Sequence, residues 1–143
     1  MIRRIYAQEI EQVLKLWLAG NREAHAFIAD TYWLANLAPV RQQLLDAELW
    51  GYEYQAKLVG FAGFQGDYLA GIFIARNYRD RGLGKELLDF LKRVHPNFTL
   101  SVYRKNVRAV KFYQREGLEL VSKAIDEQTG QEELVMEWQG GQN

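Results

Sequence analysis

The chain has 143 residues, 48% of them hydrophobic, and its 18 Lys and Arg residues balance 18 Asp and Glu residues. This length and apolar content predict one domain with a buried core, and the balanced charge excludes the broad basic field typical of nucleic-acid-binding proteins. Cysteine is absent, which excludes disulfides, thiolate metal sites and a cysteine nucleophile.

The chain lacks a run of about 18 apolar residues and a secretion-signal pattern, so we expect a cytoplasmic protein that does not enter a membrane. We expect residues 1–139 to form a single domain. The polar tail at 140–143, GGQN, is expected to be disordered.

The N-terminal half predicts a strand, then helices, then strands. Residues 2–7 form a β-rich run, and apolar residues at helical spacing predict a helix over 9–19 that ends before Gly20. Residues 24–47 predict two helical pieces, because Pro39 must start, kink or split a helix. Residues 48–55 and 57–66 predict a hairpin that turns at Gln55 and Ala56, and 67–75 a third strand.

The C-terminal half predicts an alternation of helix and strand. A helix over 82–94 ends at His95, because the residue before Pro96 avoids the helical region. Residues 98–103 predict a strand, Asn106 is a good N-cap for a helix through 115, and Gly117 ends that helix. Residues 118–126 and 132–138 predict a closing hairpin. The result is an α/β fold, with the order β-α-α-β-β-β-α-β-α-β-β and helices on both faces of a mixed sheet.

The loop RDRGLGK at 79–85 suits an anionic ligand. Gly82 and Gly84 allow close backbone approach beside the free N–H groups of a helix start, and Arg79, Arg81 and Lys85 add positive charge. The spacing of a P-loop and that of a dinucleotide-binding fingerprint both fail here. The alternative for the loop alone is a solvated surface turn.

Two motifs in this order and separation resemble the GNAT superfamily of acetyl-CoA-dependent N-acetyltransferases. They are Arg79-x-x-Gly82-x-Gly84 after a strand, and Asn106-x-x-Ala109-x-x-Phe112-Tyr113-x-x-x-Gly117 before another strand. The match covers about residues 2–138. The tract with His25, Phe27, Ile28, Tyr32 and Trp33 further resembles a small single-domain bacterial subgroup.

The resemblance implies a mostly antiparallel sheet that is interrupted to hold coenzyme A. The backbone of 81–85 would wrap the pyrophosphate, and the strand at 72–74 would splay from the strand at 99–103 and leave amide groups free for the pantetheine arm. Asn106 would bond that arm as well as cap its helix, although the cap alone also explains it. The implied coenzyme-binding residues are Ile72, Phe73, Ile74, Arg79, Arg81, Gly82, Leu83, Gly84, Lys85, Asn106, Ala109 and Phe112. No metal is required.

The family pattern makes Tyr113 the general acid for the leaving thiol, since a tyrosine with a pKa of about 10 stays protonated at neutral pH. The alternative is an aromatic residue that packs on an amphipathic helix. Many family members carry a glutamate base in the strand that 68–74 matches, but this segment contains no acidic residue. The candidates for the base are His25, which we prefer, Glu53 and Asp67. His25 has a packing role as its alternative.

We expect the acceptor amine to meet Phe27, Tyr32 and Trp33, with Asp126 or Glu127 adding negative charge; core packing is the alternative. A protein lysine, an N-terminus or a small amine all fit. The rival functions are a non-catalytic acyl-CoA-binding regulatory module and a nucleotide-binding domain. The Trp and Tyr content leaves room for a homodimer surface.

Overall fold

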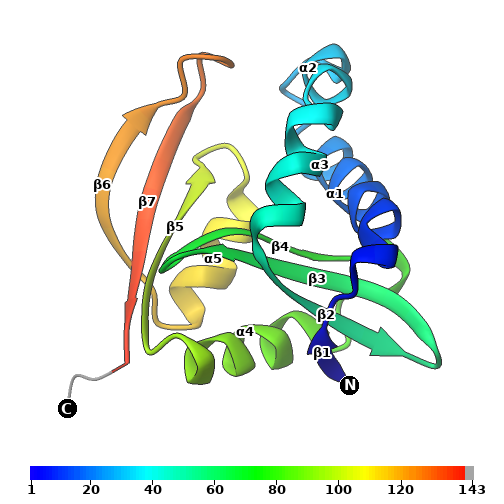
Figure 1. Cartoon of the computed structure of the whole chain (residues 1–143). Helices are drawn as coiled ribbons and strands as arrows, with labels where there is room; N and C mark the ends of the chain where they lie inside the picture. The colour runs from blue at the N-terminus through cyan, green and yellow to red at the C-terminus, as the bar shows by residue number, and fades with distance from the viewer. Residues whose placement is uncertain (141–143) are drawn as a thin grey trace.

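The computed structural model describes residues 1–140, which fold around one seven-stranded sheet of order β1-β2-β3-β4-β5-β7-β6 (Figure 1). The strands are β1 (Ile2–Arg4), β2 (Glu48–Tyr54), β3 (Lys57–Gln65), β4 (Tyr68–Ile74), β5 (Asn97–Tyr103), β6 (Glu119–Ile125) and β7 (Glu132–Gln139). The helices are α1 (Ile10–Ala24), α2 (Asp30–Ala35), α3 (Leu37–Asp46), α4 (Leu83–Val94) and α5 (Val107–Arg115), with 3-10 turns at Ala7–Glu9 and Arg76–Tyr78.

All neighbouring strands pair antiparallel except β4 and β5, which run parallel. This confirms the mixed, mostly antiparallel sheet. None of the helices in residues 1–140 has the length and apolarity that a bilayer crossing requires. Of the tail expected to be disordered, 141–143 lie outside the described residues. Gly140 donates its N–H to the carbonyl of Pro96.

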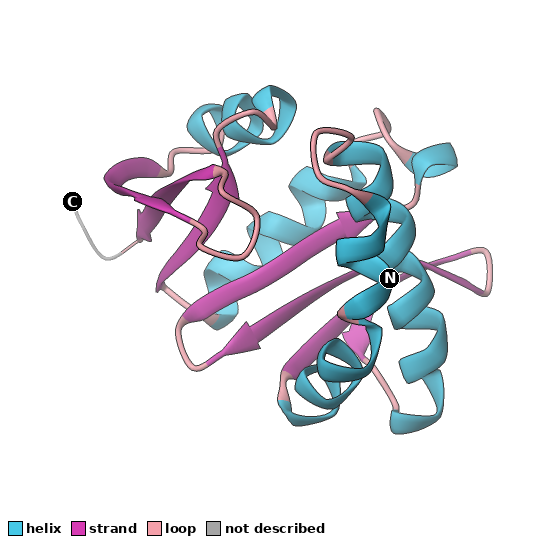
Figure 2. Cartoon of the chain, turned by 90° about the horizontal axis from the view of Figure 1, so that it is seen from above, coloured by secondary structure: helices cyan, strands magenta, loops and turns pink. Residues whose placement is uncertain are grey.

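Helices cover both faces of the sheet, as the sequence predicts. On one face, α1 and α3 bury Val13 and Leu44 against β2 and β3. On the other, α4 buries Leu87 and Leu91, and α5 buries Tyr113, against β3, β4, β5 and β7. Seen from above, the helices flank the strands of the sheet, which are drawn in magenta (Figure 2). Burial of these apolar faces is the main stabilising contribution, at about 25 cal/mol per Å² removed from water.

The local signals read from the sequence are confirmed where they depend on backbone geometry. Gln55 and Ala56 both take positive φ values, 50° and 62°, which matches the twist of a two-residue hairpin turn. Pro39 lies in the first turn of α3, where its missing N–H leaves no helical hydrogen bond unmade. The helix α4 ends at Val94, before Pro96.

The first helix is longer than the sequence predicts. It continues through Gly20 to Ala24 instead of ending at residue 19. Gly20 is buried, and a Cβ at this position would lie 2.4 Å from Cδ1 of Phe73 on β4. The glycine therefore allows close approach between helix and sheet and does not end the helix, a role that only the tertiary contact reveals.

Candidate active site

The strands β4 and β5 separate and form a slot between them. They pair only at Tyr68 with Thr99 and at Leu69 with Leu100. The register of β4 with β3 shifts between Gly63 and Phe64, which leaves Ala70 as an extra residue on β4. Such a bulge bends a strand and ends its pairing, so β4 turns away from β5 from this point. We call this gap the β4–β5 slot; it is lined by residues 70–74 and 101–103.

The slot is part of one cavity of about 830 Å³ that also reaches the start of α4 and the end of α1. Of the residues predicted to bind the coenzyme or catalyse, most line this cavity: His25, Ile72, Phe73, Ile74, Arg79, Gly82, Gly84, Lys85, Asn106, Ala109, Phe112 and Tyr113. Its lining does not include Arg81 or Leu83. Leu83 points into the core instead, at 8% exposure, so only its backbone is available to the loop.

The glycine-rich loop begins α4 with a backbone that favours glycine. Gly82 is the N-cap residue and has φ 80°, in the left-handed region. A Cβ on Gly82 would meet nothing within 4 Å, and one on Gly84 would lie 3.8 Å from Phe112. The first N–H groups of a helix have no partner within the helix, so the loop presents backbone donors suited to a phosphate group.

The cations of the loop are held by neighbouring carboxylates. Arg79 donates to the carbonyl of Ile74 at 3.2 Å and to Glu23 at 2.5 Å. Lys85 pairs with Asp89 and Glu116. The Arg79–Glu23 and Lys85–Asp89 pairs are partly exposed, and exposed ion pairs are weak, so a phosphate can replace these carboxylates as the partner of the cations; Glu116 is buried.

Two further arginines lie near the glycine-rich loop, and the sequence did not indicate them as site residues. Arg108, in the first turn of α5, pairs with Asp80 at 2.9 Å. Arg76 lies in the 3-10 turn and lines an adjoining hollow together with Arg79 and Arg108. Neither belongs to a motif, and only the folded chain brings them to the glycine-rich loop.

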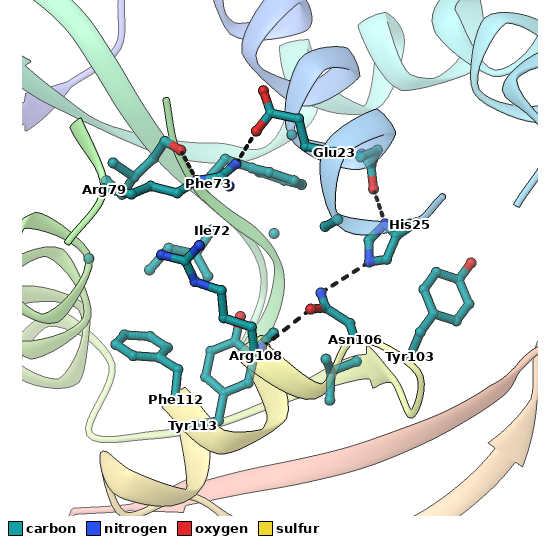
Figure 3. A pocket seen from close by; sticks show the side chains of 18 of the residues that line it. Glu23, His25, Ile72, Phe73, Arg79, Tyr103, Asn106, Arg108, Phe112 and Tyr113 are labelled. Carbon is teal, nitrogen blue, oxygen red and sulfur yellow. Dashed lines mark hydrogen bonds and ion pairs between the residues drawn. The ribbon is translucent and has the colours of Figure 1, made fainter. Parts of the chain in front are cut away.

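A chain of hydrogen bonds crosses the cavity from α1 to α5 (Figure 3). The Nδ2 group of Asn21 donates to the carbonyl of Trp17, so its Oδ1 faces His25 and accepts from Nδ1 at 3.0 Å. Asn106 accepts from the N–H of Ala109 through Oδ1, the predicted helix cap, and its Nδ2 donates to Nε2 of His25 at 3.2 Å. Both amides thus fix their own orientation, and together they fix the imidazole as the neutral tautomer with hydrogen on Nδ1.

The imidazole of His25 is therefore fixed in position by its neighbours. Burial lowers its pKa from about 6.5 to about 4, and the imidazole stacks on Trp33 with ring centroids 5.6 Å apart. Its one lone pair is used by Asn106. These contacts favour the packing role that the sequence left open beside the catalytic one.

Tyr113 lies in the wall of the cavity, on the face of α5 that packs against the sheet. Only 9% of the residue is exposed. Burial raises the pKa of its hydroxyl above the usual value of about 10. Figure 3 shows Tyr113 and Phe112 rising from α5 towards the strand that carries Ile72 and Phe73. A tyrosine that stays protonated beside the β4–β5 slot is suited to give a proton to a leaving thiolate.

The predicted acceptor residues separate into one that lines the cavity and two that support it. Trp33 lines the cavity. Phe27 packs edge-on against His25 and Tyr103, and Tyr32 packs edge-on against Trp33 and donates its hydroxyl to Gln128. The pKa of Tyr32 is raised by burial and by the nearby charges of Asp126 and Glu133.

Two of the three base candidates lie outside the cavity. Glu53 pairs with Arg3 at the β1 edge of the sheet. Asp67 accepts from His95 at 3.0 Å, beyond the paired end of β4. The acidic residues that do line the cavity are Glu23, Asp80 and Glu133. Within residues 1–140, no group of three or more acidic or histidine side chains is placed to hold a metal ion.

Comparison with known proteins identifies the family. Residues 10–118 match the model of the acetyltransferase (GNAT) family. The chain belongs to this family. It is 36% identical, over 96% of both chains, to the peptidyl-lysine N-acetyltransferase YiaC of Escherichia coli, and 28% identical, over 86% of both, to the peptidyl-lysine N-acetyltransferase YjaB of Salmonella typhimurium.

Solved GNAT structures share the whole fold. Apo-form YjaB from Escherichia coli superposes with a TM-score of 0.87 at 26% identity, covering 99% of this chain and 98% of that one. The PaiA N-acetyltransferase of Thermoplasma acidophilum, solved with coenzyme A, superposes with a TM-score of 0.82 at 17% identity and confirms the fold. The protein is thus an acetyl-CoA-dependent N-acetyltransferase, and the rival functions, a non-catalytic module and a nucleotide-binding domain, are set aside.

Proposed function

We propose that this GNAT enzyme acetylates lysine side chains of proteins or peptides. The observation that carries the proposal is a single cavity that joins the glycine-rich loop, the β4–β5 slot and Tyr113 and then continues to Trp33 and Tyr103. A thioester held in the slot can therefore meet an amine that enters from the other end. The names of the YiaC and YjaB relatives, both peptidyl-lysine N-acetyltransferases, support a lysine as that amine.

We assign the end of the cavity at the glycine-rich loop to coenzyme A and the end at Trp33 and Tyr103 to the acceptor amine. The backbone of 81–85 and the arginines at 76, 79 and 108 suit the phosphates of coenzyme A, because guanidinium groups and helix-start N–H groups both favour phosphate. Arg81, which lies over the ring of Tyr78, adds charge to this loop from outside the cavity. Residues 72–74 pair with β3 on one edge but not with β5 on the other, and this open edge suits the pantetheine amides and can give an N–H to the thioester carbonyl.

We assign the proton for the departing thiol to Tyr113. Acetyl-CoA supplies an activated acetyl group, and transfer to an amine leaves a thiolate that needs a proton. Tyr113 is the buried hydroxyl of the cavity wall that matches the family position, and its raised pKa keeps it protonated. Asn106 positions the start of α5, from which Tyr113 projects. His25 holds Asn106 in place.

Calorimetric titration of acetyl-CoA, followed by mass spectrometry of a lysine-containing peptide incubated with enzyme and acetyl-CoA, tests the proposal. We expect micromolar binding and a mass gain of one acetyl group on the lysine. The double variant Arg81→Ala, Gly82→Ala should lose binding, because it removes loop charge and places a Cβ at φ 80°. Binding without acetylation of any lysine peptide would contradict lysine as the acceptor.

A further inference from the structure

The open face of the C-terminal strands forms one wall of the cavity, at the end that we assign to the acceptor amine. Leu134 and Met136 of β7 face the core shared with α4 and α5, so Glu133 and Glu137 face the opposite side. The core under α1 and α3 contains residues of β2, β3 and β4 but, within 1–140, none of β5, β6 or β7. Every residue of β6 is exposed. A substrate can therefore approach this face without displacing a helix.

Glu133 lies on this face beside the cavity. It pairs in register with Tyr103 of β5, and directly opposed residues of antiparallel strands point to the same face. Both residues line the cavity, together with His25 and Trp33. We call these four residues the acceptor end.

The carboxylate of Glu133 has no hydrogen-bond or ion-pair partner in the part of the chain that the structure describes. Among residues 1–140, no N–H or O–H group donates to it, although it is half-buried. Its neighbours are all paired: Glu132 with Arg104, Asp126 with the hydroxyl of Tyr103, and Glu23 with Arg79. A half-buried charge without a donor is costly unless a cation arrives, and the ammonium group of an acceptor is such a cation.

The groups around Glu133 make it more basic. Tyr103 faces it from β5, Asp126 from the turn after β6, and Tyr32 from α2, while His25 and Lys105 lie elsewhere on the cavity wall. Burial, and then the negative charge of Asp126, raises the pKa of Glu133 above its usual value. A carboxylate with a raised pKa binds a proton more strongly and is a better base near neutral pH.

We propose that Glu133 binds the ammonium group of the acceptor and takes its proton, so that β7 supplies the base that β4 lacks. This inference rests on the proposed lysine acetyltransferase function. The whole reaction converts an ammonium and acetyl-CoA to an acetamide, free coenzyme A and one proton. Glu133 holds that proton first and releases it to water. Tyr113 gives its own proton to the thiolate and regains one from the amide nitrogen as the amide forms.

The test compares two glutamates of the same strand. Glu137 shares the face of Glu133, four residues further along β7, but does not line the cavity. We expect Glu133→Gln to lower kcat/KM for a lysine peptide by about 100-fold or more at pH 7.5, the lower end of the range for acid–base catalysis. Glu137→Gln should stay within twofold of wild type. Both should keep the acetyl-CoA dissociation constant.

The pH profile separates a base from a structural residue. The loss of kcat/KM in Glu133→Gln relative to wild type should become smaller as pH rises towards the lysine pKa of about 10.4, because the acceptor amine then deprotonates in water. A deficit of constant size across pH, or activity within threefold of wild type at pH 7.5, would overturn the role of Glu133 while leaving the proposed function intact. Wild-type protein that does not acetylate lysine peptides would overturn both.

Discussion

The side chain of Asn106 joins α5 to α1 by a hydrogen bond of 3.2 Å from its Nδ2 to Nε2 of His25, while its Oδ1 caps α5. One amide thus fixes the start of the helix that carries Tyr113 and the tautomer of the imidazole across the cavity. Because the two bonds use different atoms of the amide, substitutions can remove them separately.

Asn106→Ala removes both bonds, and we expect the free energy of unfolding to fall by about 1–2 kcal/mol, most of it from the lost cap. Asn106→Asp keeps an oxygen for the cap but cannot donate to His25. It should retain stability within about 0.5 kcal/mol and raise the pKa of His25, since a carboxylate then faces the imidazole. Urea unfolding and NMR titration of His25 check the pair. Equal destabilisation by both variants would show that the contact with His25, and not the cap, stabilises the helix.

The pKa values of the two histidines of the chain should lie on opposite sides of the usual histidine pKa of about 6.5. Burial lowers the pKa of His25 to about 4. For His95, burial alone lowers the pKa, but hydrogen bonds and charge from Asp67 and Glu48 outweigh burial and raise it. NMR spectra of the imidazole ring protons of the two histidines, recorded from pH 3 to 9, should show one transition below pH 6.5 and one above it. The transition that is missing in His95→Gln belongs to His95.

These shifts also predict how stability depends on pH. A raised pKa means that the folded chain holds the proton more strongly, so the contribution of His95 is complete below about 6.5 and is lost as pH rises through its folded pKa. A lowered pKa has the reverse effect, so His25 makes the fold lose stability as pH falls from about 6.5 towards about 4. In His95→Gln, the free energy of unfolding should fall less steeply as pH rises above about 6.5, while its fall as pH drops below about 6.5 should remain. An unchanged alkaline slope would contradict this account.

Tyr113→Phe removes the proposed proton donor and keeps the ring that packs in the core. We expect kcat to fall by about 100-fold or more, with the acetyl-CoA dissociation constant and the melting temperature nearly unchanged. In the wild type, the raised pKa of Tyr113 means that ionisation of this group should not reduce kcat between pH 7 and 10. Val110→Ala, on the same helix, serves as the packing control, because Val110 packs against the same core and does not line the cavity. Turnover unchanged in Tyr113→Phe would exclude it as the acid.

Gly84→Ala separates ligand binding from folding. The new Cβ would lie 3.8 Å from Phe112, an ordinary contact, and alanine favours the first turn of α4 over glycine, so stability should stay level or rise by up to about 1 kcal/mol. Acetyl-CoA binding should weaken at least tenfold, because the methyl group occupies space that a phosphate needs beside the loop. Calorimetry of binding and thermal melting measure the two effects. Tight binding by the variant would place the phosphates elsewhere.

Gly20→Ala, in contrast to Gly84→Ala, should lower the stability of the fold. A Cβ at this position would lie 2.4 Å from the ring of Phe73, which is itself stacked on Phe61, so the ring or the helix must move. We expect a loss of about 1–3 kcal/mol of unfolding free energy, the usual cost of overpacking. Ala19→Gly, next to it on α1, is the control for helix propensity alone. A melting temperature for Gly20→Ala equal to that of wild type would show that the contact adjusts freely.

The sequence by itself determined the local elements and the family. The positive-φ turn at Gln55 and Ala56, the end of α4 before Pro96, the cap at Asn106 and the loop at Gly82 are set by residues adjacent in the chain, and local backbone chemistry is enough to predict them. The two GNAT motifs are equally local, since the residues of each lie within a short segment of the chain.

Only the tertiary structure decided which residues meet across the cavity. Gly20 was read as a helix end because its reason, the ring of Phe73, comes from a distant strand. His25 looked available as a base until the fold brought Asn106 to its lone pair. Glu133 gave no signal, because the face that it occupies and its lack of a partner depend on the register of β7 with β5. Contacts between residues far apart in sequence depend on strand pairing and packing, which local patterns do not specify.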